Sequence, residues 1–304
     1  MQIDAAFRQR IPTVFGSAGA AWLDALPAIL AEFAERWSLS LGEPFALSYN
    51  FVVAAMRNGE AVVLKAGVPG PELRSEIAAM RLFDGAGAAR VLEADVERGV
   101  MLLERVDPGA VLADLWPARD DEATRITAGV MRSLWRPLSA GHPFPTLERW
   151  SLALERMARD HARAQPLDAR LLQRAVVIRR ALLDSAPETV LLHGDLHHLN
   201  ILSSKRAGWL LIDPKGVAGE RAYECGPFLL NPSGLMNAPQ QVGAMIAKRV
   251  EILSDLLALD CARVMRWAFV HSVLSACWSA EDGEDGGEAL NIARIIEHDH
   301  SVLL

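Results

Sequence analysis

Residues 190–214 read VLLHGDLHHLNILSSKRAGWLLIDP, and this stretch decides the architecture that we predict for the chain. Two short apolar runs, 189–192 and 209–212, enclose a polar segment. Oxygen-bearing side chains stand around these runs at Asp195, Asn200 and Asp213. Runs of this length and composition are typical of buried strands. We therefore expect the three side chains to converge near the strand ends.

This spacing predicts a phosphoryl-transfer centre. Such a centre needs a carboxylate that orients the acceptor hydroxyl and takes its proton, together with hard oxygen ligands that hold Mg²⁺ on the nucleotide phosphates. His193-Gly194-Asp195, followed by Asn200, fits the pattern His-x-Asp-x-x-x-x-Asn. We predict Asp195 as the catalytic base, with Asn200 and Asp213 as Mg²⁺ ligands. The alternative, that these residues only turn a loop between strands, accounts for one of them more easily than for all three.

Residues upstream supply the elements of a nucleotide site. Lys65 lies in the apolar strand 61–66, where a lysine can hold the α- and β-phosphates of ATP. Glu76, in the helix predicted from residue 72, can pair with this lysine, and Glu72 is the less favoured partner. The alternatives are a lysine exposed on an edge strand and a solvated helix glutamate.

The N-terminal part is predicted as a small lobe, residues 1–106. An amphipathic helix spans 20–37, and a five-stranded antiparallel sheet with one helix follows. The strand-like segments are 45–56, with a loop at 47–51, then 61–66, 89–94 and 100–104; an Asn-Gly turn at 57–60 joins the first two.

Two segments of this lobe are predicted to meet the nucleotide. The loop at 47–51 contains no glycine, so Ser48, Asn50 and backbone N–H groups would contact the phosphates. The Asp-Pro-Gly turn at 107–109 marks a boundary. If it is a hinge, backbone groups from Glu104 to Val106 would meet the adenine.

The remainder, residues 107–304, is predicted as a mostly helical lobe that contains the catalytic strands. Helical patterns recur along it at 121–136, 147–163, 169–185, 223–229, 239–259, 262–279 and 288–299. The fold class is therefore α+β, with a β-sheet lobe and a helical lobe.

Composition excludes several classes of protein. The net charge of −7 disfavours nucleic acid and anionic membrane as partners, and no apolar run approaches the length of a membrane span. The three cysteines are widely spaced, which argues against a disulfide framework or a structural zinc site. We expect a cytoplasmic protein without a signal or transit peptide, as a monomer or weak dimer.

An acidic segment near the C-terminus is a candidate acceptor contact. Glu281 and Asp282 follow Trp278, and Glu284, Asp285 and Glu288 continue the segment. One interpretation is a solvated acidic loop. The other is a pocket in which carboxylates and the indole of Trp278 meet a cationic substrate.

The motifs together resemble the aminoglycoside and hydroxyurea resistance kinases, in particular the streptomycin 6-phosphotransferase branch. HGDLHHLNIL followed by LLIDPKGVAGERAYE carries the resemblance, with VVLKAGVP and MLLERVDPGAVLADL upstream. It implies a protein-kinase-like fold and an ATP- and Mg²⁺-dependent transfer to an aminoglycoside hydroxyl, conferring antibiotic resistance. It also implies that His193 braces the catalytic loop. Gly194 stands where protein kinases usually have arginine, which implies no control by a phosphorylated activation loop.

Two alternatives remain open at this point. The chain could phosphorylate another small hydroxyl compound, such as hydroxyurea, a choline-like amine or a sugar. It could also be a nucleotide-binding pseudokinase, although Lys65, Asp195, Asn200 and Asp213 are all present.

Overall fold

The computed structural model describes residues 3–160 and 167–300. The chain divides into two compact units, Met1–Asp107 and Pro108–Leu304. The division follows Asp107, within the Asp-Pro-Gly turn that was predicted as a boundary. We describe each unit by itself.

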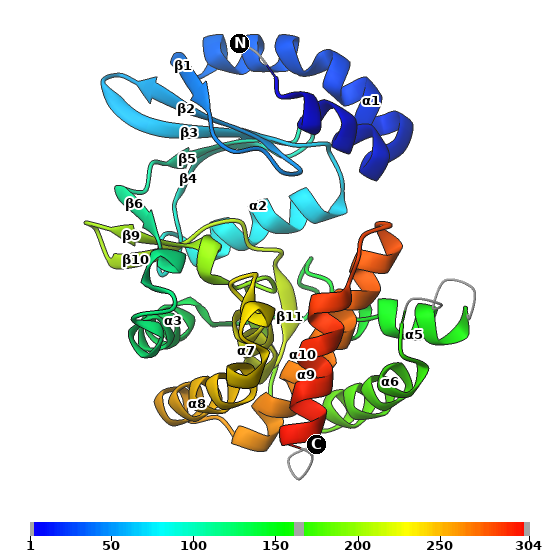
Figure 1. Cartoon of the computed structure of the whole chain (residues 1–304). Helices are drawn as coiled ribbons and strands as arrows, with labels where there is room; N and C mark the ends of the chain where they lie inside the picture. The colour runs from blue at the N-terminus through cyan, green and yellow to red at the C-terminus, as the bar shows by residue number, and fades with distance from the viewer. Residues whose placement is uncertain (1–2, 161–166, 301–304) are drawn as a thin grey trace. The chain divides into compact units, whose positions relative to one another are not determined.

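The first unit contains the predicted five-stranded antiparallel sheet (Figure 1). Its strand order is β1-β2-β3-β5-β4, and its strands are β1 (Leu39–Pro44), β2 (Phe51–Arg57), β3 (Glu60–Ala66), β4 (Val91–Asp95) and β5 (Val100–Glu104). The predicted strand 45–56 begins only at Phe51, because residues 45–50 form a loop between β1 and β2. Asn58 and Gly59 both have positive φ, as a tight hairpin turn requires.

Two helices cover opposite faces of this sheet, α1 (Ala5–Arg36) and α2 (Pro71–Phe83) (Figure 1). Side chains alternate between the faces of a strand. Leu64 and Ala66 join the core cluster that includes the apolar residues of α1. Lys65, between them, faces the other side and meets Glu76 of α2. The strand period therefore places Lys65 beside α2.

Helix α1 begins fifteen residues before the predicted start at residue 20. Pro12 and a kink at Gly16, with φ of 60°, interrupt the periodicity that a helix prediction relies on. The helix also contains an 18-residue window that is long and apolar enough to cross a membrane by composition alone. Phe7 and Phe33 of this helix are fully buried in the core of the first unit, whereas Val14 is exposed. Of the apolar window, 28% is buried.

The second unit contains two three-stranded sheets and a set of helices. The sheets have the orders β10-β9-β6 and β11-β8-β7. Their strands are β6 (Pro108–Val111), β7 (Arg136–Pro137), β8 (Val190–Leu192), β9 (Ile201–Ser204), β10 (Gly208–Leu211) and β11 (Val217–Gly219). The helices are α3 (Asp120–Leu134), α4 (Leu147–Trp150), α5 (Ala153–Arg159), α6 (Ala169–Asp184), α7 (Cys225–Leu229), α8 (Pro239–Leu257), α9 (Cys261–Glu281) and α10 (Gly287–Asp299). Short 3₁₀ turns lie at Leu112–Leu115, His198–Asn200, Arg221–Glu224 and Leu235–Asn237.

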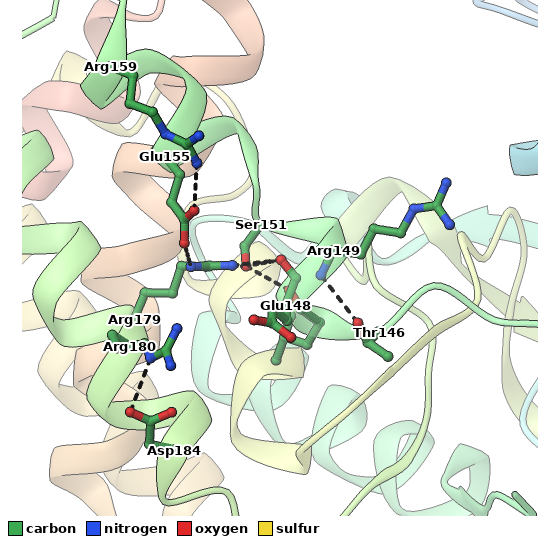
Figure 2. A network of polar contacts seen from close by, with 10 residues as sticks. Thr146, Glu148, Arg149, Ser151, Glu155, Arg159, Arg179, Arg180 and Asp184 are labelled. Carbon is green, nitrogen blue, oxygen red and sulfur yellow. Dashed lines mark hydrogen bonds and ion pairs between the residues drawn. The ribbon is translucent and has the colours of Figure 1, made fainter.

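The predicted helix 147–163 is wrong, because the structure breaks it into α4 and α5; residues 161–163 lie outside the described chain. The break at Ser151 is held by the buried guanidinium of Arg179 in α6 (Figure 2). Arg179 donates to Ser151 Oγ at 2.6 Å, to the Glu148 carbonyl at 2.6 Å and to Glu155 Oε1 at 2.8 Å. A buried charge with these partners avoids the cost of an unpaired one. The turn that carries Trp150 is thereby fixed.

Candidate active site

The catalytic loop, residues 193–200, leaves β8 and ends in the 3₁₀ turn before β9. The imidazole of His193 bridges this loop and the strand that precedes Asp213. His193 Nδ1 accepts the backbone N–H of Asp195 at 3.3 Å, and Nε2 donates to the Ile212 carbonyl at 2.8 Å. Complete burial lowers the pKa of His193 to about 4, so the ring is neutral at pH 7. The bracing role implied for His193 has a clear geometric basis.

A buried carboxylate holds the backbone of the same loop. Glu224 Oε2 accepts the N–H of His193 at 2.6 Å, and Oε1 accepts the N–H of Gly194 at 2.9 Å. Glu224 is fully buried, and burial raises its pKa to about 7 despite these two hydrogen bonds. Glu224 was not predicted as a site residue. The signal that could have revealed it is a charged residue inside the apolar run around Tyr223 and Phe228.

Asp195 and Asn200 lie at the two ends of one short turn. Asn200 Nδ2 donates to the backbone carbonyl of Asp195 at 3.0 Å, which leaves Oδ1 as the acceptor of the amide. The Asp195 carboxylate is 39% exposed, so an incoming hydroxyl can reach it. His197 Nε2 lies 3.9 Å from Asp195 Oδ1 and 3.3 Å from Asn200 Nδ2. His197 is therefore a neighbour of both Asp195, the predicted base, and Asn200.

Asp213 stands just beyond β10, in the left-handed region with φ of 59°. The N–H of Ile212 donates to the Asn200 carbonyl at 3.0 Å, so the residue before Asp213 is hydrogen-bonded to the backbone of Asn200. Beyond Asp213, the N–H of Lys215 donates to the His193 carbonyl at 2.7 Å. The segment that carries Asp213 is thus attached to both ends of the catalytic loop.

The donor chemistry of this loop fits Mg²⁺. An amide oxygen from Asn200 and a carboxylate from Asp213 are hard ligands, and Mg²⁺ usually takes only one or two protein groups and completes its shell with phosphates and water. Among the described residues, no group of three or more His, Cys, Asp or Glu side chains could hold a metal. An all-protein cage is accordingly not part of the described site.

Gly194 occupies a position that no larger residue could adopt without a shift. Its φ is +85°, and a Cβ built there would lie 2.7 Å from Val217 Cγ2 of β11. An arginine at this position would therefore require Val217 or the loop to shift.

In the first unit, Lys65 and Glu76 form a buried ion pair. Lys65 Nζ lies 2.6 Å from Glu76 Oε1, and the two side chains are 2% and 8% exposed. Glu72 lies exposed in the first turn of α2. The structure therefore brings together the favoured pair of residues.

Further nucleotide contacts were predicted in the loop at 47–51 and at the hinge at 104–106. Ser48 is exposed in the loop at 45–50, whereas the Asn50 side chain is directed at Gly67, where a built Cβ would meet Asn50 Oδ1 at 2.1 Å. At the predicted hinge, the N–H of Glu104 donates to the Arg90 carbonyl at 3.0 Å, so this N–H is not available to adenine. Val106 is buried.

The acidic segment is exposed from Glu281 to Asp285, and two of its carboxylates, those of Glu281 and Glu288, have hydrogen-bond partners. Glu281 is the last residue of α9, and its carboxylate receives two hydrogen bonds of 2.8 Å from Arg156. Asp282 is exposed. Further along, Glu288 Oε1 accepts the N–H of Gly234 at 2.9 Å.

Trp278 belongs to an aromatic cluster that continues toward the catalytic loop. Its ring lies 5.4 Å from that of Trp150 and 5.8 Å from that of His271. Trp150 Nε1 donates to the Tyr223 hydroxyl at 3.0 Å, and Tyr223 precedes Glu224, which holds the loop. The cluster connects Trp278 to Tyr223, the residue before Glu224.

Comparison with known proteins decides the family. The model described as "Aminoglycoside/hydroxyurea antibiotic resistance kinase" matches residues 36–283. The chain belongs to this family.

Characterised relatives agree with this assignment. A streptomycin 6-kinase of Streptomyces glaucescens is 33% identical, and the match covers 88% of both chains. A streptomycin 3''-kinase of Klebsiella pneumoniae is 33% identical over 82% of this chain and 91% of the relative. A hydroxyurea phosphotransferase of Kitasatospora aureofaciens is 32% identical over 88% of this chain and 77% of the relative.

Solved structures share the fold of this resistance kinase. A choline/ethanolamine kinase family protein from Mesorhizobium loti superimposes with a TM-score of 0.65 at 17% identity, covering 93% of this chain and 98% of that one. An aminoglycoside phosphotransferase in complex with ADP and hygromycin B gives 0.60 at 14% identity, covering 91% and 97%. The predicted family, the kinase-like α+β fold and the reaction class, ATP-dependent phosphotransfer to a hydroxyl group, are confirmed.

Proposed function

We propose that this resistance kinase transfers the γ-phosphoryl group of ATP to a hydroxyl of an aminoglycoside, and that this aminoglycoside is streptomycin. The observation that carries the proposal is the catalytic loop itself, in which Asp195 is exposed while His193 and Glu224 hold its backbone. Relatives that are streptomycin kinases favour the acceptor. They act on two different hydroxyls according to their names, so identity alone does not select the position on the sugar.

In the proposed reaction, the carboxylate of Asp195 accepts a hydrogen bond from the acceptor hydroxyl and takes its proton. The hydroxyl oxygen bonds to the γ-phosphorus of ATP, while the bond from this phosphorus to the bridging β-phosphate oxygen breaks and ADP leaves. Because the transition state of phosphoryl transfer is loose, orientation of the hydroxyl contributes more than basicity. Lys65, fixed by Glu76, would bind the nucleotide phosphates. Asn200 and Asp213 would hold Mg²⁺, which neutralises charge on the phosphates when it is bound.

The acceptor would lie against the aromatic cluster of Trp278 and Trp150. Streptomycin is cationic, and indole faces attract cations that come within about 6 Å of the ring. Glu281 would add a carboxylate at the end of the same helix, in competition with Arg156. Asp282 would contribute through its exposed charge.

Mass spectrometry of streptomycin after incubation with the protein and MgATP tests the proposal. We expect one added phosphoryl group, which fragmentation assigns to the 6 or the 3'' hydroxyl. Asp195→Ala serves as the control and should abolish the product while the protein still binds nucleotide. An unmodified antibiotic together with rapid ADP release on hydroxyurea would instead favour the activity that the Kitasatospora relative is named for.

A further inference from the structure

The loop at residues 45–50 has no glycine, yet it adopts a defined path at the start of β2. It is supported at both ends by contacts within the first unit. Arg105 lies over the ring of Phe45, 4.6 Å from its centroid. At the other end, the side chain of Asn50 is directed at Gly67, which is buried and itself donates to the Gly99 carbonyl at 3.0 Å.

The middle of the loop is held by α1. Arg10 Nη1 donates to the Leu47 carbonyl at 3.2 Å and to the Ser48 carbonyl at 3.3 Å. Arg10 is half-buried on the helical segment before the kink at Gly16. One guanidinium nitrogen thereby fixes two successive peptide groups of the loop.

The same segment of α1 is anchored beside the loop by aromatic packing. The ring of Phe7 lies 6.2 Å from that of Phe51, the first residue of β2, and 6.3 Å from that of Trp22, both in edge-to-face geometry. Phe7, Phe51 and Trp22 belong to one buried cluster, and Leu47 packs against it. Arg10 therefore extends from a rigid support.

The orientation of the two carbonyls has a consequence for the opposite side of the loop. In a trans peptide unit the C=O and N–H groups point in opposite directions. Because the Leu47 and Ser48 carbonyls face Arg10, the N–H groups of Ser48 and Tyr49 point away from it. Successive backbone N–H groups on one side of a turn form a site for anionic phosphate oxygens.

We propose that Arg10 is a positioning residue for nucleotide binding, which holds loop 45–50 so that its N–H groups receive the phosphates of ATP. Helix α1 is then part of the nucleotide site, although all but its last residue lies outside the region that the family model matches. The inference rests on the proposed function, because it assumes that this loop contacts ATP. Side-chain support from α1 takes the place of the glycine residues that such loops commonly use.

Isothermal titration calorimetry with the Mg²⁺ complex of AMP-PNP tests this role without any acceptor. Arg10→Met keeps the aliphatic stem and should raise the Kd about three- to tenfold, as expected for lost hydrogen bonds from a charged group. Arg10→Lys retains the charge without the guanidinium fork, so its Kd should lie between those of the wild type and Arg10→Met. Arg8→Met, which removes an exposed charge two residues earlier, should bind like the wild type.

The outcomes separate positioning from other effects. Equal weakening by Arg8→Met and Arg10→Met, with Arg10→Lys unchanged, would mean that only net charge matters, and would overturn the inference. The melting temperature and the KM for streptomycin should change little in Arg10→Met; if that variant does not fold, the Arg10→Lys titration decides. A wild-type protein that fails to bind the nucleotide would refute the proposed function and this inference together. Nucleotide binding without phosphorylation of streptomycin would refute only the proposed acceptor.

Discussion

Glu224 Oε2 lies 2.6 Å from the backbone nitrogen of His193, and its other oxygen lies 2.9 Å from the nitrogen of Gly194. One fully buried carboxylate thus fixes the two residues that precede Asp195, the proposed base. Charge-assisted hydrogen bonds of this kind are stronger than neutral ones. The orientation of Asp195 therefore depends on a side chain 29 residues further along the chain.

Glu224 should make both stability and activity depend on pH. Its pKa is about 7 in the folded protein, against the ordinary value of 4.5. Between these values the folded state binds the extra proton, so the contribution of Glu224 to stability falls as pH rises from 4.5 to 7, by on the order of 3 kcal/mol. Urea unfolding at several pH values should show this fall in the wild type and not in Glu224→Gln.

The activity should depend on the ionisation of Glu224 in the opposite direction to the stability. The ionised carboxylate accepts both N–H groups, so kcat should rise with pH along a limb centred near pH 7. In Glu224→Gln this limb should disappear and kcat should be about ten- to a hundredfold lower, because an amide offers only one acceptor oxygen. A variant that keeps the wild-type pH profile would show that Glu224 does not position the loop.

The Lys65–Glu76 pair allows stability and function to be separated. Glu76→Ala leaves a buried ammonium without its carboxylate and should destabilise the protein by about 3–5 kcal/mol. Lys65→Met combined with Glu76→Leu should recover most of this stability, since an apolar pair can replace a buried ion pair. The double variant should still lack activity and bind MgATP weakly. Recovery of phosphotransfer along with stability would contradict the assignment of Lys65 to the phosphates.

Gly194 and Gly208 provide a matched pair of positive-φ glycines. An alanine at Gly208, with φ of +75°, meets nothing within 4 Å, so Gly208→Ala should cost only the backbone strain, about 1–2 kcal/mol, with kcat unchanged. Gly194→Ala has the same kind of strain and also meets Val217 Cγ2 at 2.7 Å. It should lower kcat at least tenfold because the loop must move. Similar kcat values for the two variants would contradict this.

Competition between Arg156 and the acceptor for Glu281 predicts opposite effects on KM. Glu281→Gln should raise the KM for streptomycin about two- to fivefold, whereas Arg156→Gln should lower it by a comparable factor, because the carboxylate becomes available. Arg149→Gln controls for the general loss of a positive charge, because Arg149 is exposed on α4 (Figure 2). If neither Glu281→Gln nor Arg156→Gln changes KM, the pair is structural only. Trp278→Leu should raise the KM for streptomycin without altering the KM for ATP.

Local patterns in the sequence predicted much of the fold and the core of the site. The apolar runs gave β8 and β10, the Asn-Gly pair gave the hairpin between β2 and β3, and the strand and helix periods brought Lys65 to Glu76. The first half of α1 and the break at Ser151 were missed. Pro12 and Gly16 interrupt the helical pattern in the first half of α1. The buried Arg179 of another helix determines the break at Ser151.

The sequence by itself predicted the reaction class, because Asp195, Asn200 and Asp213 stand at the short spacing that is typical of phosphoryl transfer, and strands and turns preserve such a spacing. Only the tertiary structure decided what supports these residues. Glu224 reaches His193, Arg10 reaches Leu47, and Arg156 reaches Glu281 across 31, 37 and 125 residues. Such contacts depend on how distant elements pack, and no local propensity specifies which charged side chain will be buried or paired.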